Sequence, residues 1–307
     1  MSHVEALSDL YRRVRAVGRR DPDFKLFGAS MHQWMVFKLT PDEQAEAEAR
    51  HGLTLPDDYR WWLSEASGAG IGPFYGLLHP LDSQPCADEL AGAIPLSDHG
   101  CGYADYLLTR GEHAGRVWVD FREGDGPLTE WYPSFAAWLD AWLVRSFAEW
   151  GIEYLGTWNA TEADADFLAE VGEALARIDA GTDDPMLVQY PLPHDKLRIA
   201  RGRLALHGGR VGEAEAMFDA AAEISKEPEA MRALGRCEVA KAQGDHAGWL
   251  AAADAGLTAS ALWWISEKQL LEHRFHALTA LGRTEEAAAA RAAVAAHDPN
   301  DAAYQDA

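Results

Sequence analysis

The chain has 307 residues, of which 48% are hydrophobic and 25% are charged, a composition typical of a globular protein with about two domains. Collagen-like, low-complexity and disordered classes are therefore excluded. Its 27 lysines and arginines stand against 49 aspartates and glutamates, which gives a formal net charge of −22. We expect no nucleic-acid partner and no membrane partner, because both carry negative charge, and we expect any charged partner to be basic.

Targeting signals and cysteine chemistry are not apparent. No segment reaches the length of a membrane span, and the first residues lack the basic and apolar regions of a secretion signal. We therefore expect a cytoplasmic protein. The three cysteines, Cys86, Cys101 and Cys237, are too few and too scattered for a disulfide framework or a metal knuckle, and we expect them to be buried free thiols.

The first half of the chain alternates helical and strand patterns. Apolar residues at helical spacing predict a helix over residues 4–17, whose arginines we expect to dock on the chain itself. Thr40 with Glu43 predicts a capping box for a helix that runs to about Arg50 and closes at residues 51–52. A second helix begins at Pro56.

Strand patterns follow a glycine-dense segment, residues 68–76, whose spacing does not fit a phosphate-binding loop. Residues 106–109 and 116–121 are rich in β-forming side chains and predict an antiparallel hairpin. Ser134 is then the predicted N-cap of a helix with an aromatic core-facing stripe. Helices, a hairpin and a further helix indicate an α+β domain.

The second half is alanine-rich and helical. Thr161 and Asp164 predict a helix start, and the prolines at 185, 191 and 193 predict a linker. Turn glycines at 209, 244 and 282 are 35 and 38 residues apart, close to the roughly 34-residue period of tetratricopeptide repeats. We predict about two and a half to three tetratricopeptide-like helical units, and two domains over residues 1–158 and 159–307.

Several motifs occur in the first half in a characteristic order. They are Phe27-Gly28 with His32, Leu55-Pro56-x-Asp58-Tyr59-Arg60-x-Trp62-Leu63, Gly72-Pro73-x-Tyr75-Gly76-Leu77, Pro80-Leu81, Gly100-Cys101-Gly102, Gly115-Arg116-Val117-Trp118 and Ser134-Phe135-x-x-Trp138-Leu139. In this order they resemble the SMI1/KNR4 (SUKH superfamily) domain over about residues 22–158. The chain departs from the family pattern at Trp62, where an aromatic Phe is commoner, and at residues 67–70, where the family has Asn-Gly-Gly.

The resemblance implies a mostly antiparallel sheet flanked by helices and a role in protein binding rather than in chemistry. Many bacterial members are similar to immunity proteins that neutralise secreted toxins, whereas fungal relatives are regulatory scaffolds. The family motif residues are expected to be mainly structural: Leu55, Pro56, Tyr59, Trp62, Leu63, Gly72, Pro73, Tyr75, Gly76, Gly115, Trp118, Phe135, Trp138 and Leu139.

Catalytic and metal motifs are weak. Asp98-His99-Gly100-Cys101 and Glu272-His273-x-x-His276 each place possible ligands close together, but neither has the paired spacing of a zinc site. No Gly-x-Ser-x-Gly elbow occurs. We therefore predict no catalytic residues, no metal and no cofactor; convergence of residues distant in sequence leaves an enzyme as a weaker alternative.

Two binding functions fit the sequence. The first is an immunity-type module that binds a protein partner, for example a basic toxin, and the second is an intracellular adaptor that uses the helical repeats. Exposed charge beside a partly exposed aromatic residue is typical of an interface. On this ground we predict partner-binding residues at Asp57, Asp58, Trp61, Glu65, Glu112 and His113.

Overall fold

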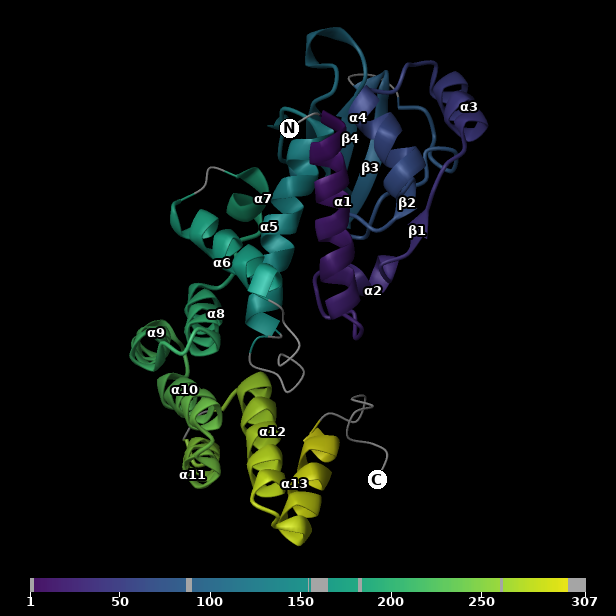
Figure 1. Cartoon of the computed structure of the whole chain (residues 1–307). Helices are drawn as coiled ribbons and strands as arrows, with labels where there is room; N and C mark the ends of the chain where they lie inside the picture. Colours follow the sequence, from purple (N-terminus) through teal and green to yellow (C-terminus); the bar gives the residue numbers. More distant parts are fainter. Residues whose placement is uncertain are drawn as a thin grey trace. The chain divides into compact units, whose positions relative to one another are not determined.

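The computed structural model describes residues 3–86, 90–153, 155, 165–181, 184–259 and 262–297. The chain divides into two compact units: unit 1 is Met1–Glu153 with Ala169–Pro191, and unit 2 is Tyr154–Leu168 with Leu192–Ala307 (Figure 1). The predicted boundary between residues 158 and 159 lies outside the described residues, as does the predicted capping pair Thr161 and Asp164.

Unit 1 is an α+β domain, as predicted. Its helices are α1 (His3–Arg20), α2 (Ala29–His32), α3 (Pro41–His51), α4 (Asp57–Trp61) continued by a π-helical turn η1 (Trp62–Ala66), α5 (Phe135–Glu153), the second part of α6 (Ala165–Asp179) and α7 (Pro185–Gln189). Its strands are β1 (Val36–Phe37), β2 (Ala69–Gly70), β3 (Ala93–Gly100), β4 (Tyr103–Leu108), β5 (Val117–Asp120) and β6 (Leu128–Tyr132).

The strands form an antiparallel meander in the order β3-β4-β5-β6, and β1 pairs with β2 in a second, two-stranded sheet. The predicted hairpin is confirmed as β4 and β5, in which Tyr106 lies opposite Trp118 and Leu107 opposite Val117. Val117 and Val119 are buried on one face of β5, as the alternation of apolar residues predicts.

The helix signals in the first half are also confirmed. Thr40 and Glu43 form a complete capping box, and Gly52 ends α3 in the left-handed conformation with φ 61°. In α1, Arg13 pairs with Asp140 of α5 at 3.0 Å and with Glu170 of α6 at 2.9 Å. The basic face of this helix therefore docks on acidic side chains of the same chain, as expected.

The core of unit 1 lies where α1, α4 and α5 meet the sheet. Phe135 of α5 packs edge-on against Tyr59 and Trp62, with ring centroids 4.9 and 5.9 Å away, and Tyr11 of α1 contacts the other side of Trp62. Burial of such large aromatic side chains supplies most of the free energy of folding. The aromatic stripe of α5 is thus core, as its helical spacing indicates.

The segment after α6, which the prolines indicated to be a linker, contains a short helix docked on unit 1. Asp184 caps α7 by accepting hydrogen bonds from the backbone of Met186 and Leu187, and it accepts a 2.6 Å bond from the hydroxyl of Tyr132 in β6. Tyr190 then reaches His99 of β3 at 3.0 Å. We call residues 184–190 the strap. Proline signals cannot reveal this docking, because its partners lie more than 50 residues away.

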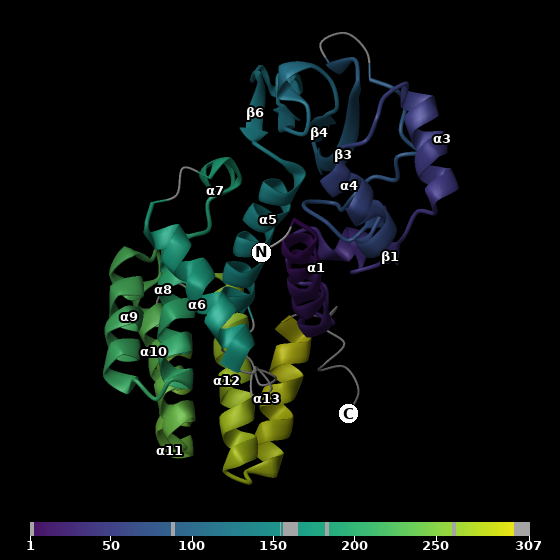
Figure 2. The same ribbon diagram turned by 45° about the horizontal axis from the view of Figure 1, so that its top comes forward.

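Unit 2 contains three helical hairpins, in agreement with the repeat spacing: α8 (His194–His207) with α9 (Val211–Ile224), α10 (Pro228–Gln243) with α11 (His246–Leu257), and α12 (Trp264–Ala280) with α13 (Thr284–His297). The turn glycines Gly209, Gly244 and Gly282 all have φ near +70°, which glycine adopts without steric cost. The paired helices lie side by side (Figure 2).

A row of polar side chains crosses the first helices of the three hairpins. Arg203, Glu238 and His273 are 35 residues apart and occupy α8, α10 and α12. The guanidinium of Arg203 donates to the Glu238 carboxylate at 3.0 Å, and the His273 ring lies 3.8 Å from the same carboxylate. All three residues are buried, so the repeat period places one charge network along the interior of the array.

Candidate binding surface

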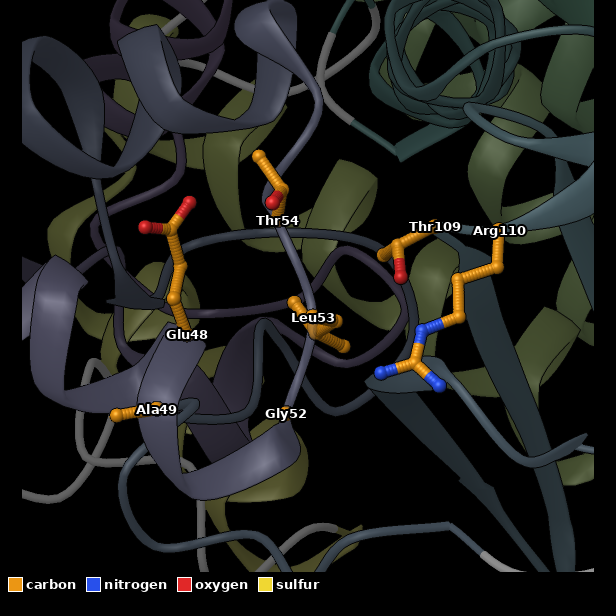
Figure 3. A pocket seen from close by; sticks show the side chains of 7 residues that line it. All are labelled: Glu48, Ala49, Gly52, Leu53, Thr54, Thr109 and Arg110. Atoms are coloured by element: carbon orange, nitrogen blue, oxygen red, sulfur yellow. The ribbon is translucent and has the colours of Figure 1, made fainter.

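An open pocket of about 420 Å³ lies on unit 1 between the end of α3 and the turn after β4. Its walls are formed by Glu48, Ala49, Gly52, Leu53, Thr54, Thr109 and Arg110 (Figure 3). We call it the Arg110 pocket. Two threonines, an apolar wall and two charged side chains give it donors, acceptors and apolar contact together, a combination suited to a protein side chain or chain terminus.

The two charged groups of the pocket differ in what they already bind. The Glu48 carboxylate accepts a 2.8 Å hydrogen bond from the backbone of Leu55 and a 2.5 Å bond from Arg60. Its negative charge is therefore largely satisfied within the chain. In Figure 3 the guanidinium of Arg110 lies on the other side of Leu53 from Glu48, and within the described residues it makes no ion pair.

Gly92 makes room for the Arg110 side chain, and Gly52 lies beside its charged end. A Cβ atom at Gly92, whose φ is +87°, would lie 2.7 Å from Cδ of Arg110, and one at Gly52 would lie 3.6 Å from its Nη2. Arginine therefore lies across the backbone between two loops and remains exposed at its charged end. A guanidinium held this way offers several N–H donors to a carboxylate or a carbonyl group of a partner.

The predicted partner-binding residues on α4 are only partly exposed. Asp57 and Trp61 belong to α4 and Glu65 to the following turn η1. Asp57 and Glu65 are exposed, and Trp61 is half-buried. Asp58 is a correction, because it is 8% exposed. Its carboxylate turns back onto the first turn of the helix and accepts a 2.8 Å hydrogen bond from the backbone of Tyr59, so it does not project to a partner.

Glu112 and His113 lie in the turn between β4 and β5. Glu112 is exposed, whereas His113 is half-buried and its ring lies 3.2 Å from the Glu130 carboxylate and edge-on to Trp118. Glu112 therefore remains available to a partner, and His113 is held on the sheet surface.

The six predicted residues form two groups, one on α4 and η1 and one on the β4–β5 turn. The Arg110 pocket lies between the segments that carry them, because Thr54 precedes Asp57 by three residues and Arg110 precedes Glu112 by two. Sequence reasoning missed the pocket itself, because its walls meet only through tertiary packing.

The family motif residues are mostly buried in unit 1. Those buried are Leu55, Tyr59, Trp62, Leu63, Gly72, Pro73, Gly76, Phe135, Trp138 and Leu139, while Pro56, Gly115 and Trp118 are intermediate. Tyr75 differs, since it is 40% exposed. Its ring covers Gly100, where a Cβ would lie 2.7 Å from the Tyr75 hydroxyl.

The histidines that resembled metal ligands have other partners. His99 donates or accepts at 2.8 Å with Asp105 and at 3.0 Å with Tyr190, and its ring stacks on Phe74. Burial raises the pKa of Asp105, against the opposing effects of His99 and Trp138. Among the described residues no three His, Cys, Asp or Glu side chains are grouped as metal ligands would be.

The cysteines depart from the expectation of buried thiols. Cys237 is fully buried in α10, but Cys86 is intermediate and Cys101 is exposed. Cys101 lies in the β3–β4 turn with φ 54°, in a conformation that turns its side chain away from the core. Burial of a thiol cannot be read from residue type alone.

One comparison with known proteins finds a family match over the segment that contains the pocket. Residues 38–141, about a third of the chain, match the model of the SMI1 / KNR4 family (SUKH-1). This segment is similar to the SMI1/KNR4 domain. Every residue that lines the Arg110 pocket lies inside it. Neither the curated proteins nor the solved structures contain a match to the chain.

The SMI1/KNR4 domain is followed by helices, as expected, and no helix of the described residues is both long and apolar enough to cross a bilayer. The domain begins at Lys38, within the segment that joins β1 to α3, and ends inside α5. Helix α1 and the strap, which complete unit 1, therefore lie outside the matched segment.

Proposed function

We propose that this chain is a non-catalytic protein-binding module whose SMI1/KNR4 domain captures a partner protein at the Arg110 pocket. The observation that carries the proposal is an exposed guanidinium in an open pocket, with the exposed carboxylates Asp57 and Glu112 on the bordering segments. The partner we favour is a basic toxin, in keeping with immunity-type members of the family.

The charges of this surface suit a basic protein that also presents a carboxylate or a chain terminus. Asp57, Glu65 and Glu112 attract cationic side chains over a long range and speed encounter, and the net charge of −22 adds to this attraction. Arg110 instead recognises one acceptor at short range. A bidentate guanidinium contact of this kind fixes the register of a complex.

The test is co-purification with the protein encoded beside the gene, followed by affinity measurement on variants. Arg110→Ala removes the short-range contact, and the double change Asp57→Lys and Glu112→Lys reverses the rim charge. We expect each to weaken binding by about tenfold or more. Glu215→Lys, at an exposed position of unit 2, is the matched charge control.

Loss of affinity in the pocket variants and not in the control supports the proposal. Unchanged binding by all of them, with protection against the toxin retained, excludes the pocket as the interface. If neither binding nor protection by the native chain is found for any neighbouring gene product, the immunity function loses its basis.

The helical array favours a second candidate, an adaptor. Trp263 and Trp264 are 58% and 54% exposed at the start of α12, and Lys226 lies 5.4 Å over the Trp263 ring. Adjacent exposed tryptophans are typical of residues that carry binding energy in interfaces. Such a surface would serve a partner different from that of the SMI1/KNR4 domain.

A shortened chain separates the two functions. Ending it after Pro191 keeps Asp184 and Tyr190, whose hydrogen bonds attach the strap to unit 1. Full toxin protection by this chain favours the immunity function. Loss of partner capture both here and in full-length Trp263→Ala with Trp264→Ala favours the adaptor.

A further inference from the structure

Strand β1 is the outer strand of the two-stranded sheet. It pairs with β2 alone, with Val36 opposite Gly70 and Phe37 opposite Ala69. On its other side, β2 continues toward the larger sheet through bridges from Gly70 to Leu77 and from Leu77 to Ser97. Figure 1 accordingly shows β1 at the outer margin of unit 1, with β2 on its inner side. An outer strand is a template for a further strand.

The backbone groups of β1 alternate between β2 and the open side. The carbonyl of Met35 accepts from Ile71 at 2.8 Å and that of Phe37 accepts from Gly68 at 2.6 Å. Gly70, the residue opposite Val36, exchanges both of its hydrogen bonds with Leu77, at 3.0 and 2.8 Å. Val36 therefore cannot bond to Gly70, and its N–H and C=O face outward.

The backbone groups of Lys38, two residues after Val36, face the open side of β1 as well. Within the described residues outside helices and strands, no backbone hydrogen bond reaches Lys38, and the bonds between Gly70 and Leu77 leave Gly70 none for Val36. The open side of β1 thus presents two residues' donors and acceptors at the two-residue spacing of a strand ladder. An extended peptide can satisfy them without displacing any bond of the chain.

The side chains around this edge are unusually apolar for a surface. Met35 is 42% exposed and Phe37 is 50% exposed, on the same face of β1. Just before them, Phe24, Phe27 and Met31 are 37%, 44% and 60% exposed. The exposed side chains of Met35 and Phe37 on β1 give an added strand both apolar contact and adaptable packing.

The charge beside the open side of β1 determines which added strand binds favourably. Lys38 is exposed and makes no ion pair within the described residues, so it offers a cation directly beside the outward-facing backbone. A second copy that pairs through its own β1 is disfavoured as the occupant, because that strand brings a second lysine at Lys38 and no acidic residue. A foreign strand with an acidic residue opposite Lys38 gains both the ladder bonds and an ion pair.

We propose that β1 is a strand-addition site for an extended peptide segment with alternating apolar and acidic residues. Its apolar side chains lie beside Met35 and Phe37, its acidic side chains lie on the face of Lys38, and its backbone bonds to Val36 and Lys38. Main-chain bonds supply affinity and the alternating side chains supply specificity, as in other strand-addition complexes. This surface is separate from the Arg110 pocket.

The test uses the full chain and a fluorescent, end-capped nonapeptide of alternating valine and glutamate. We expect saturable binding by anisotropy, and we expect the amides of Val36 and Lys38 to gain protection from hydrogen exchange. The Phe37 amide already donates to the hydroxyl of Ser67 at 3.4 Å, so its exchange should change little. A peptide of alternating valine and lysine should bind at least about fivefold more weakly.

Variants of β1 separate the contributions of the backbone bonds, the apolar contact and the ion pair to peptide binding. Val36→Pro removes one outward donor and no bond to β2, and should weaken binding by about fivefold. Phe37→Asp and Lys38→Glu test the apolar contact and the ion pair. Their controls are Val4→Asp, at another exposed apolar position of unit 1, and Arg236→Glu, which makes the same charge change in unit 2.

Absence of binding to either peptide at millimolar concentration overturns the proposal. Binding without protection of the Val36 and Lys38 amides also overturns it, because the peptide then lies elsewhere. Since exchange is measured on the native chain, this outcome does not depend on whether Val36→Pro folds. Tighter binding of the lysine peptide would refute the assigned charge.

Discussion

Gly28 and Gly111 have similar backbone conformations, with φ +81° and +72°, but very different surroundings. A Cβ at Gly28 would lie 1.6 Å from the carbonyl oxygen of Phe74, whereas nothing lies within 4 Å of one at Gly111. The first glycine permits close approach of two loops, and the second only permits a turn. The distinction matters because a positive φ alone costs an alanine about 1 kcal/mol, whereas a clash with backbone costs more.

Alanine substitution measures this difference. Gly111→Ala should lower the free energy of unfolding by about 1 kcal/mol, while Gly28→Ala should lower it by several times as much, because the Phe74 loop must move. Urea unfolding followed by tryptophan fluorescence compares the two. Equal losses would show that the approach to Phe74 is not held in solution.

His273 is a buried base with a defined hydrogen bond. Its Nδ1 accepts from the indole N–H of Trp249 at 2.9 Å, which requires a neutral ring. Burial lowers the pKa of His273 from 6.5 to about 4, although the Glu238 carboxylate raises it, and Lys241 and Arg203 lower it further.

This lowered pKa predicts a loss of stability in acid. Between pH 6.5 and 4 the unfolded chain binds a proton at His273 and the folded chain does not, so stability falls as the pH falls through this window. The contribution is on the order of 3 kcal/mol. His273→Gln should reduce the pH dependence of unit 2 unfolding, measured by denaturant titration at several pH values. If the variant's unfolding free energy depends on pH as strongly as that of the native chain, groups other than His273 cause the pH dependence.

Among the elements, helix caps and turns were predicted correctly from near neighbours in the sequence. The docking of the strap was not predicted. The Thr40 capping box and the turn glycines are set by contacts within a few residues, so pattern alone predicts them. The strap follows from bonds between Tyr132 and Asp184 and between His99 and Tyr190. No local pattern indicates that residues so distant in sequence meet.

The strap should therefore loosen when one of these bonds is removed. Tyr132→Phe deletes a hydroxyl that donates to Asp184 at 2.6 Å and accepts from the backbone of Met186 at 3.1 Å. We expect faster amide exchange at Met186 and faster chymotryptic cleavage near Tyr190, with a stability loss of about 1 kcal/mol. Tyr11→Phe is the matched control in α1, and equal effects of both changes would argue against a docked strap.

At the scale of the molecule, charge is spread evenly. Residues 1–158 contain 13 basic and 24 acidic side chains, and residues 159–307 contain 14 and 25, so each half carries −11. The acidity therefore does not mark the SMI1/KNR4 domain as the sole site of charge recognition. It does imply self-repulsion within each half, which salt screens.

Added salt should consequently stabilise the chain. We expect the thermal midpoint to rise between 0.01 and 0.5 M sodium chloride, because screening relieves repulsion more than it weakens exposed ion pairs, each of which contributes little. The double change Glu215→Lys and Glu229→Lys, at exposed positions, should reduce this rise. A midpoint that falls with salt would mean that ion pairs outweigh the net charge.

Patterns in the amino-acid sequence were sufficient to predict the α+β domain, the β4–β5 hairpin, the helical hairpins and the family resemblance. All of these depend on periodicity and on interactions between near neighbours, which are written locally in the chain. Tertiary structure alone decided that Asp58 is buried, that Arg110 lies across Gly52 and Gly92 in a pocket, and that β1 keeps an open edge. Those properties depend on which backbone and side-chain groups from distant parts of the chain meet. Such contacts leave no pattern in any short segment of the sequence.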